Sequence, residues 1–239
     1  MELISVIIPV YNQAKVLRRS LVSLLNQSYR PIEVIIVNDG STDNFSEVIG
    51  KILAKKKFRE LKIKVINQLN QGAPAARNHG FSEAVGHYVI FWDADTIARS
   101  EMLETMHQAL VDNPAASWVY SQFRFGWKKI KSSQFDIELL KKNNYVDVTS
   151  LIRRDAFLPF DERLRRFQDW DLWLTLVEKG HSGVFVPKLL YKKIINPLGI
   201  SSWLPSFFFS LPWKISEVGK YEAAAQIVKQ KHGIFYSSS

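Results

Sequence analysis

The first half of the chain alternates short apolar runs with segments whose apolar residues recur at helical spacing. Residues 4–10 (ISVIIPV) and 32–37 (IEVIIV) are near-continuous β-branched runs, typical of strands buried on both faces. Residues 15–27 carry apolar side chains three and four positions apart, which predicts an amphipathic helix. The alternation continues with strands predicted at 63–67 and 88–92 and helices at 43–57, 73–85 and 101–111. Strand–helix–strand repetition with short connections predicts an α/β fold, a mostly parallel sheet with helices on both faces.

Polar residues follow three of these predicted strands, at Tyr11-Asn12, Asn38-Asp39-Gly40 and Asp93-Ala94-Asp95. Ligands of open parallel sheets bind at the carboxyl ends of the strands, so we expect these residues along one edge. Two carboxylates at spacing two can share one hard divalent cation whose other ligands are water and phosphate oxygens. Asp is also common in turns that simply close a strand, so the motif alone leaves both interpretations open.

The second half, from about residue 115, is less regular. We predict a strand of antiparallel type at 118–125, a helix at 169–179, a short strand at 184–186 and a terminal helix at 217–231. Asp169 and Asp171 bracket Trp170 at a helix start, which fits either helix-dipole charges or a general base beside an aromatic ring. Arg77 follows small residues that allow close approach of a ligand, so it could bind a phosphate or a carboxylate of that ligand or form a structural ion pair.

Composition excludes several classes of site. The absence of cysteine excludes disulfides, thiolate zinc sites and a thiol nucleophile. The sequence has neither a dinucleotide-binding Gly-x-Gly-x-x-Gly nor a Walker loop. The net charge of +9 is concentrated at the end, where residues 185–239 hold seven basic and two acidic residues. We expect this tail to meet a phosphorylated substrate or an anionic membrane, and we expect no nucleic-acid partner, because no basic-aromatic module is present.

Five segments carry the most specific motifs of the chain, in the order SVIIPVYN (5–12), IEVIIVNDGSTD (32–43), NQGAPAARNHG (70–80), WDAD (92–95) and QDWDLWLTLVEKG (168–180). Together and in this order, they resemble family 2 glycosyltransferases of the GT-A fold. The resemblance implies a GT-A catalytic domain over 1–195, a Rossmann-like sheet with a smaller antiparallel acceptor-side region. Residues 1–114 would form the nucleotide-sugar-binding half and 115–195 the acceptor-side half, followed by a hydrophobic and basic helical extension over 196–239.

The resemblance also implies an activity and roles for particular residues. The activity would be metal-dependent transfer, with inversion, of a sugar from a nucleoside-diphosphate sugar to an acceptor hydroxyl. Asp169 would be the catalytic base, and Mg²⁺ or Mn²⁺ would bind Asp95 and Asp93. Gln168 and Trp170 would contact the acceptor, and Lys192 or Lys193 the diphosphate. The residues implied to bind the donor are Pro9, Tyr11, Asn12, Asp39, Arg77 and Asp93.

The resemblance leaves partners and two other functions open. We expect a UDP-sugar donor and a glycan or lipid-linked acceptor, in polysaccharide, glycolipid or surface-glycan synthesis. Gln168 stands where the family usually has Glu, which keeps a catalytically inactive nucleotide-sugar-binding relative as an alternative. A sugar nucleotidyltransferase is a second alternative, although the Gly-rich basic signature of those enzymes is missing after the first predicted strand.

The sequence also predicts where in the cell the protein lies. We see no signal peptide and no membrane-spanning run, so we expect a cytoplasmic protein, with the inner face of the membrane as the alternative. The segment 203–213 (WLPSFFFSLPW) fits a hydrophobic lid, a peripheral membrane contact or a homodimer interface.

Overall fold

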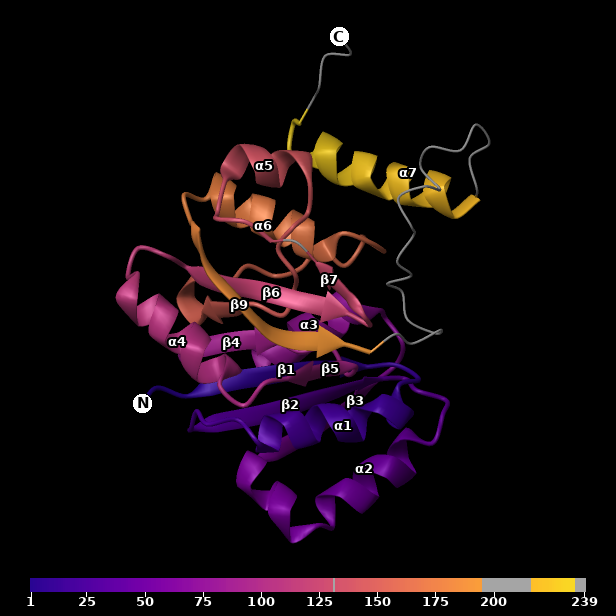
Figure 1. Ribbon diagram of the computed structural model, residues 1–239. Helices are drawn as coiled ribbons and strands as arrows, with labels where there is room; N and C mark the ends of the chain where they lie inside the picture. The colour runs from indigo at the N-terminus through magenta and orange to yellow at the C-terminus, as the bar shows by residue number, and fades with distance from the viewer. Residues whose placement is uncertain (131, 195–215, 235–239) are drawn as a thin grey trace.

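A computed structural model describes residues 1–130, 132–194 and 216–234 of the chain. Its centre is one nine-stranded sheet with the order β3-β2-β1-β4-β8-β6-β9-β5, and β7 pairs with β6 (Figure 1). The strands are β1 (Ile4–Val10), β2 (Ile32–Asp39), β3 (Ile63–Gln68), β4 (Tyr88–Phe91), β5 (Thr96–Ala98), β6 (Trp118–Phe125), β7 (Lys128–Ile130), β8 (Leu151–Arg153) and β9 (Gly183–Lys193).

Helices cover both faces of this sheet. The α-helices are α1 (Ala14–Leu25), α2 (Phe45–Leu53), α3 (Ala73–Ser82), α4 (Met102–Asp112), α5 (Ile137–Lys142), α6 (Gln168–Glu178) and α7 (Ser216–Lys231). Two 3₁₀ helices, η1 (Lys56–Leu61) and η2 (Arg154–Ala156), complete the described part. Buried residues of α1, α2 and α4 pack in one apolar core, and those of α3, α5 and α6 pack in a second.

The parallel half of the sheet confirms the α/β prediction. Strand β1 pairs in parallel with β2 and β4, and β2 pairs in parallel with β3. Side chains alternate across β1, so that Ile4, Val6 and Ile8 enter the first core while Ile7 enters the second. Both faces of the strand are therefore apolar, which explains its near-continuous hydrophobic run.

The second half departs from the prediction in several places. The three-residue strand β8 lies between β4 and β6 and runs antiparallel to both. Strand β6 is antiparallel to β8 and β7, as expected, but parallel to β9. Strand β9 has 11 residues rather than the three predicted over 184–186, and register irregularities opposite Gln122 interrupt its pairing. Such irregularities break the period-two pattern on which strand prediction depends.

The C-terminal extension is described only in part. Its helix α7 matches the prediction over 217–231, and Val228 is fully buried in the second core. The predicted segment 203–213 lies outside the described residues, so its lid, membrane and dimer interpretations stay predictions. None of the helices that the structure describes is both long and apolar enough to cross a bilayer.

Candidate active site

A cavity of about 620 Å³ lies at the carboxyl ends of the parallel strands. Its wall includes Asp39 from the end of β2, Asp93 and Asp95 after β4, and Asp169 in the first turn of α6. These four carboxylates are up to 130 positions apart in sequence, and the sheet topology brings them around one space. The predicted clustering at the carboxyl edge is therefore present in the structure.

The end of β1 contributes two of its three predicted residues to the wall. Pro9 and the half-exposed Tyr11 line the cavity. Asn12 does not line it, because its Oδ1 accepts hydrogen bonds from the amides of Thr42 (2.8 Å) and Asp43 (3.2 Å). With a φ of 53°, Asn12 adopts the left-handed conformation and ties the loop after β1 to the loop after β2.

Asp39 is buried with a carboxylate that is already well hydrogen-bonded. Its Oδ1 accepts from Gln68 Nε2 (2.8 Å) and from the Gln71 amide (2.9 Å), and its Oδ2 accepts from the Gly72 amide (2.9 Å). Gly72 has a φ of +96°, a conformation that favours glycine. Asp39 thus fixes the turn before α3 against the cavity, with lone pairs left for a ligand.

Arg77 is hydrogen-bonded to one residue that follows β4 and to one residue of α6. It lies on α3, which packs close to β1 because Gly80 faces Ile7; a Cβ at this glycine would come within 2.4 Å of Ile7 Cγ2. The guanidinium donates to Asp93 Oδ1 (3.0 Å) and to Gln168 Oε1 (3.0 Å). The ion-pair interpretation of Arg77 is therefore present in the structure, and Gln168 is held by it.

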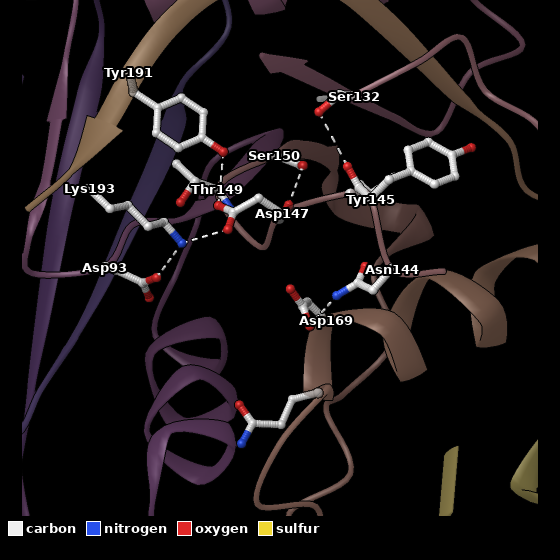
Figure 2. A network of polar contacts seen from close by, with 12 residues as sticks. Asp93, Ser132, Asn144, Tyr145, Asp147, Thr149, Ser150, Asp169, Tyr191 and Lys193 are labelled. Atoms are coloured by element: carbon white, nitrogen blue, oxygen red, sulfur yellow. Dashed lines mark hydrogen bonds and ion pairs between the residues drawn. The ribbon is translucent and has the colours of Figure 1, made fainter. Parts of the chain in front are cut away.

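Asp93 belongs to a buried charge network that includes a residue with no sequence motif, Asp147 (Figure 2). Lys193 Nζ donates to Asp93 Oδ2 (2.7 Å) and to Asp147 Oδ2 (2.6 Å), and Tyr191 Oη donates to Asp147 Oδ1 (2.9 Å). Burial alone would raise the pKa of Asp93, but Lys193 and Arg77 outweigh it and hold that pKa at about 2. Asp93 is consequently a permanent carboxylate.

Asp95 has the opposite environment. Its Oδ1 is buried and lacks a hydrogen-bond partner within the described ranges. Burial, followed by the charges of Asp93 and Asp147, raises the pKa of Asp95 to about 7. An unpartnered buried carboxylate oxygen beside a second carboxylate fits a hard cation such as Mg²⁺ or Mn²⁺. The described residues contain no group of three or more metal-binding side chains, so phosphate and water oxygens would have to complete the coordination.

Asp169 is oriented by two hydrogen bonds at the start of α6. Its Oδ1 accepts from Asn144 Nδ2 (3.0 Å) and from the Trp170 amide (2.9 Å). Burial, with a further contribution from the negative charge of Asp147, raises the pKa of Asp169 to about 6. Such a carboxylate is a stronger base than an ordinary Asp and is still mostly ionised at neutral pH.

Besides Asn12, two more residues predicted to contact a ligand, Trp170 and Lys192, do not line the cavity. The Trp170 ring is 2% exposed and donates from Nε1 to Leu140 O (2.7 Å), so it offers no stacking face to an acceptor. Lys192 is exposed and does not line the cavity, whereas its neighbour Lys193 does. Alternation along β9 sends adjacent side chains to opposite faces, so only one of the two lysines can point inward.

Sequence patterns did not point to several cavity-lining residues, among them Asn144, Asp147, Phe167 and Tyr221. The first two lie in the irregular stretch between α5 and β8, which has no hydrophobic periodicity. The side chain of Gln168 also lines the cavity, but it is bonded on both sides, with Nε2 donating to Leu164 O (3.1 Å). Only the folded chain brings these residues to Asp169.

Comparison with known proteins identifies the family. Residues 5–171 match the family model described as "Glycosyl transferase family 2". This chain therefore belongs to the family 2 glycosyltransferases, and its sheet has the GT-A fold.

Two curated relatives illustrate the range of the family. An uncharacterized glycosyltransferase of Haemophilus influenzae is 34% identical over 157 residues, covering 66% of this chain and 60% of the relative. A cholesterol galactosyltransferase of Borreliella burgdorferi is 35% identical over 158 residues, covering 66% of this chain and 37% of the relative. The chain thus spans less than two thirds of the length of either protein.

Two solved structures share the fold at low sequence identity. S. aureus TarS 1–349 in complex with UDP-GlcNAc has a TM-score of 0.71 at 19% identity, covering 96% of this chain and 72% of that chain. The mannosyltransferase PcManGT from Pyrobaculum calidifontis, in complex with GDP-Man and Mn²⁺, has a TM-score of 0.68 at 15% identity. That alignment covers 99% of this chain and 76% of PcManGT.

Proposed function

We propose that this protein transfers a sugar, with inversion, from a nucleoside-diphosphate sugar to an acceptor hydroxyl. The observation that carries the proposal is the meeting of Asp39, Asp93, Asp95 and Asp169 around one cavity at the carboxyl edge of the sheet. A UDP-sugar is the proposed donor, since TarS binds UDP-GlcNAc with the same fold. The acceptor is a hydroxyl of a glycan or a lipid-linked glycan.

The donor would lie over the first half of the sheet. Pro9, Tyr11 and Asp39 border the space for the nucleoside, and Arg77 and Lys193 place positive charge near its diphosphate. Asp95, assisted by Asp93, would hold Mg²⁺ or Mn²⁺. When bound, that cation would neutralise the negative charge that grows on the departing nucleoside diphosphate.

Asp169 would act on the acceptor. As the acceptor oxygen forms its bond to the anomeric carbon, the bond from that carbon to the β-phosphate oxygen breaks on the opposite side. The acceptor proton moves to the Asp169 carboxylate, which Asn144 holds in place. General-base assistance of this kind contributes roughly 10²–10⁴-fold to a rate.

Donor binding and catalysis are tested by separate variants. A thermal-shift panel of UDP- and GDP-sugars, with and without Mn²⁺, should show a donor that stabilises the wild type by about 2.7 kcal/mol at a hundredfold excess over Kd. Asp95→Ala should lose the Mn²⁺-dependent part of that stabilisation. Asp169→Asn should keep donor binding and lose transfer by about 10²-fold or more.

A matched control is available on the surface. Asp112 is exposed, lies on α4 and bonds only to Gln108 among the described residues, so Asp112→Asn should behave like the wild type in both assays. Donor binding without any transfer or donor hydrolysis would favour the inactive relative. Release of pyrophosphate from a nucleoside triphosphate and a sugar phosphate would favour a nucleotidyltransferase. Full activity of Asp95→Ala would rule out the metal role.

A further inference from the structure

Tyr221, on the C-terminal helix α7, lines the same cavity as Asp169. This helix lies beyond residues 5–171, the part of the chain that matches the family. The Tyr221 ring packs edge-on against Phe167, with ring centroids 4.8 Å apart and an angle of 77° between the planes. Tyr221 remains 38% exposed, so part of its ring is available to a ligand.

Phe167 is held in a defined position immediately before Gln168 and Asp169. Its φ of 59° places it in the left-handed region at the start of α6, a conformation that costs energy for a bulky residue. Its ring also makes an edge-on contact with the buried Trp170, at a centroid distance of 5.6 Å. Phe167 and Tyr221 therefore form an aromatic wall, supported from the core, on the side of the cavity that holds the base.

Ion pairs attach α7 to the helix that carries Asp169. Lys231 Nζ lies 2.8 Å from Asp171 Oδ1 and 2.9 Å from Asp161 Oδ2. The buried ring of His232 lies between Asp171 (2.9 Å) and Glu178 (2.7 Å), both on α6. Figure 1 shows α7 on the same side of the sheet as α6. Together with buried Val228, these contacts fix α7 on α6, and thereby fix Tyr221 relative to Asp169.

The chemistry of the wall suits a sugar ring. The C–H face of a pyranose packs against an aromatic ring, and its hydroxyls need polar partners within reach. Here Tyr221 and Phe167 supply the rings, while Asn144 and Arg166 are polar residues of the same cavity. A purely apolar chain would offer these polar groups no hydrogen-bond partner.

We propose that Tyr221 and Phe167 form an acceptor subsite that binds a pyranose ring, so that the acceptor of this enzyme is a glycan. The inference rests on the proposed function, because it takes Asp169 as the group that the acceptor hydroxyl approaches. Tyr221 is an acceptor-binding residue in this scheme, and α7 is part of the catalytic unit.

The test measures acceptor binding without requiring turnover. Saturation-transfer NMR would measure the affinity of methyl glucoside, galactoside, mannoside and N-acetylglucosaminide for the UDP-loaded full chain, with n-octanol as the apolar probe. At least one glycoside should bind the wild type, and Tyr221→Ala should weaken it by about tenfold. Tyr221→Phe, which keeps the ring, should stay within about twofold of the wild type. Ile227→Ala, an exposed site on the same helix, should have no effect.

Several results would overturn the subsite. Unchanged glycoside affinity in Tyr221→Ala, equal losses in Tyr221→Phe and Tyr221→Ala, or binding of n-octanol in place of all four glycosides would each do so. Calorimetry with UDP separates the two proposals. Normal UDP binding without glycoside binding overturns only the subsite, whereas failure of the wild type to bind any nucleotide or nucleotide sugar counts against the proposed function itself.

Discussion

The environment of Asp169 predicts an acidic limit on activity near pH 6. Burial and Asp147 raise its pKa to about 6, and a base must be ionised to accept a proton. With that pKa the ionised fraction is about 91% at pH 7 and about 9% at pH 5, so the turnover should fall about tenfold. An Asp of ordinary pKa would still be over about 90% ionised at pH 5 and would show almost no fall.

Two variants should move this limit in opposite directions. Asp147→Asn removes a negative charge near Asp169, which should lower the pKa of the base and extend activity to more acidic pH. Asn144→Ala removes a hydrogen bond that stabilises the ionised form, which should raise the pKa and move the limit toward neutrality. A simple loss of structure would lower activity at every pH without displacing the profile.

The assay is nucleoside-diphosphate release at saturating donor, acceptor and Mn²⁺, from about pH 4.5 to 8.5 at constant ionic strength. Saturating Mn²⁺ is needed because Asp95 also has a raised pKa, and calorimetric donor binding at each pH checks that the metal stays bound. An acidic limit near pH 4, or displacement of both variants in the same direction, would refute the assignment of Asp169 as a base tuned by its surroundings.

Three further predictions concern stability. Gly80→Ala should cost about 1–3 kcal/mol, because the new Cβ meets Ile7 at 2.4 Å, whereas Gly50→Ala in α2, with open space around it, should gain about 0.5–1 kcal/mol. Lys193→Met should cost about 3–5 kcal/mol at neutral pH, because it leaves the largely buried Asp147 without its cation and leaves Asp93 paired with Arg77 alone among the described residues, while Lys192→Met at the exposed neighbour should be nearly neutral. Burial alone would lower the pKa of His232, but its bonds to Asp171 and Glu178 outweigh this and raise it. The contribution of His232 to the free energy of unfolding should therefore be complete below pH 6.5 and be lost as the pH rises through the raised pKa. The variant His232→Gln should abolish this pH dependence of stability.

Urea denaturation measures the first two effects and thermal unfolding across pH the third. Equal effects of alanine at Gly80 and Gly50 would show that α3 is not closely packed on β1. A stable Lys193→Met protein would mean that the network around Asp93 is not desolvated. The sign derived for His232 would be contradicted if the wild type became more stable between about pH 6.5 and 8 while the His232→Gln variant gained less stability over the same range.

The sequence by itself determined the parallel half of the sheet and the carboxylates of the candidate site. In a continuous β-branched run such as residues 4–10, the side chains on both faces of the strand are apolar and must be buried between two layers. Such runs therefore predict buried parallel strands without further information. The polar residues after those strands must then share an edge, which places Asp39, Asp93 and Asp95 together. The motif around Asp169 added this residue to the predicted site, and the structure places Asp169 in the wall of the same cavity.

Tertiary structure alone decided the acceptor side. Strands β5, β7 and β8 have three residues each, too few for any period to show, and their pairing depends on partners far along the chain. The inward direction of Lys193 and outward direction of Lys192 follow from the register of β9, which no local pattern specifies. Asp147 and Tyr221 reach Asp169 only because separate segments dock on α6. Local sequence fixes the period of a segment, but the position of a side chain in a cavity depends on contacts between segments.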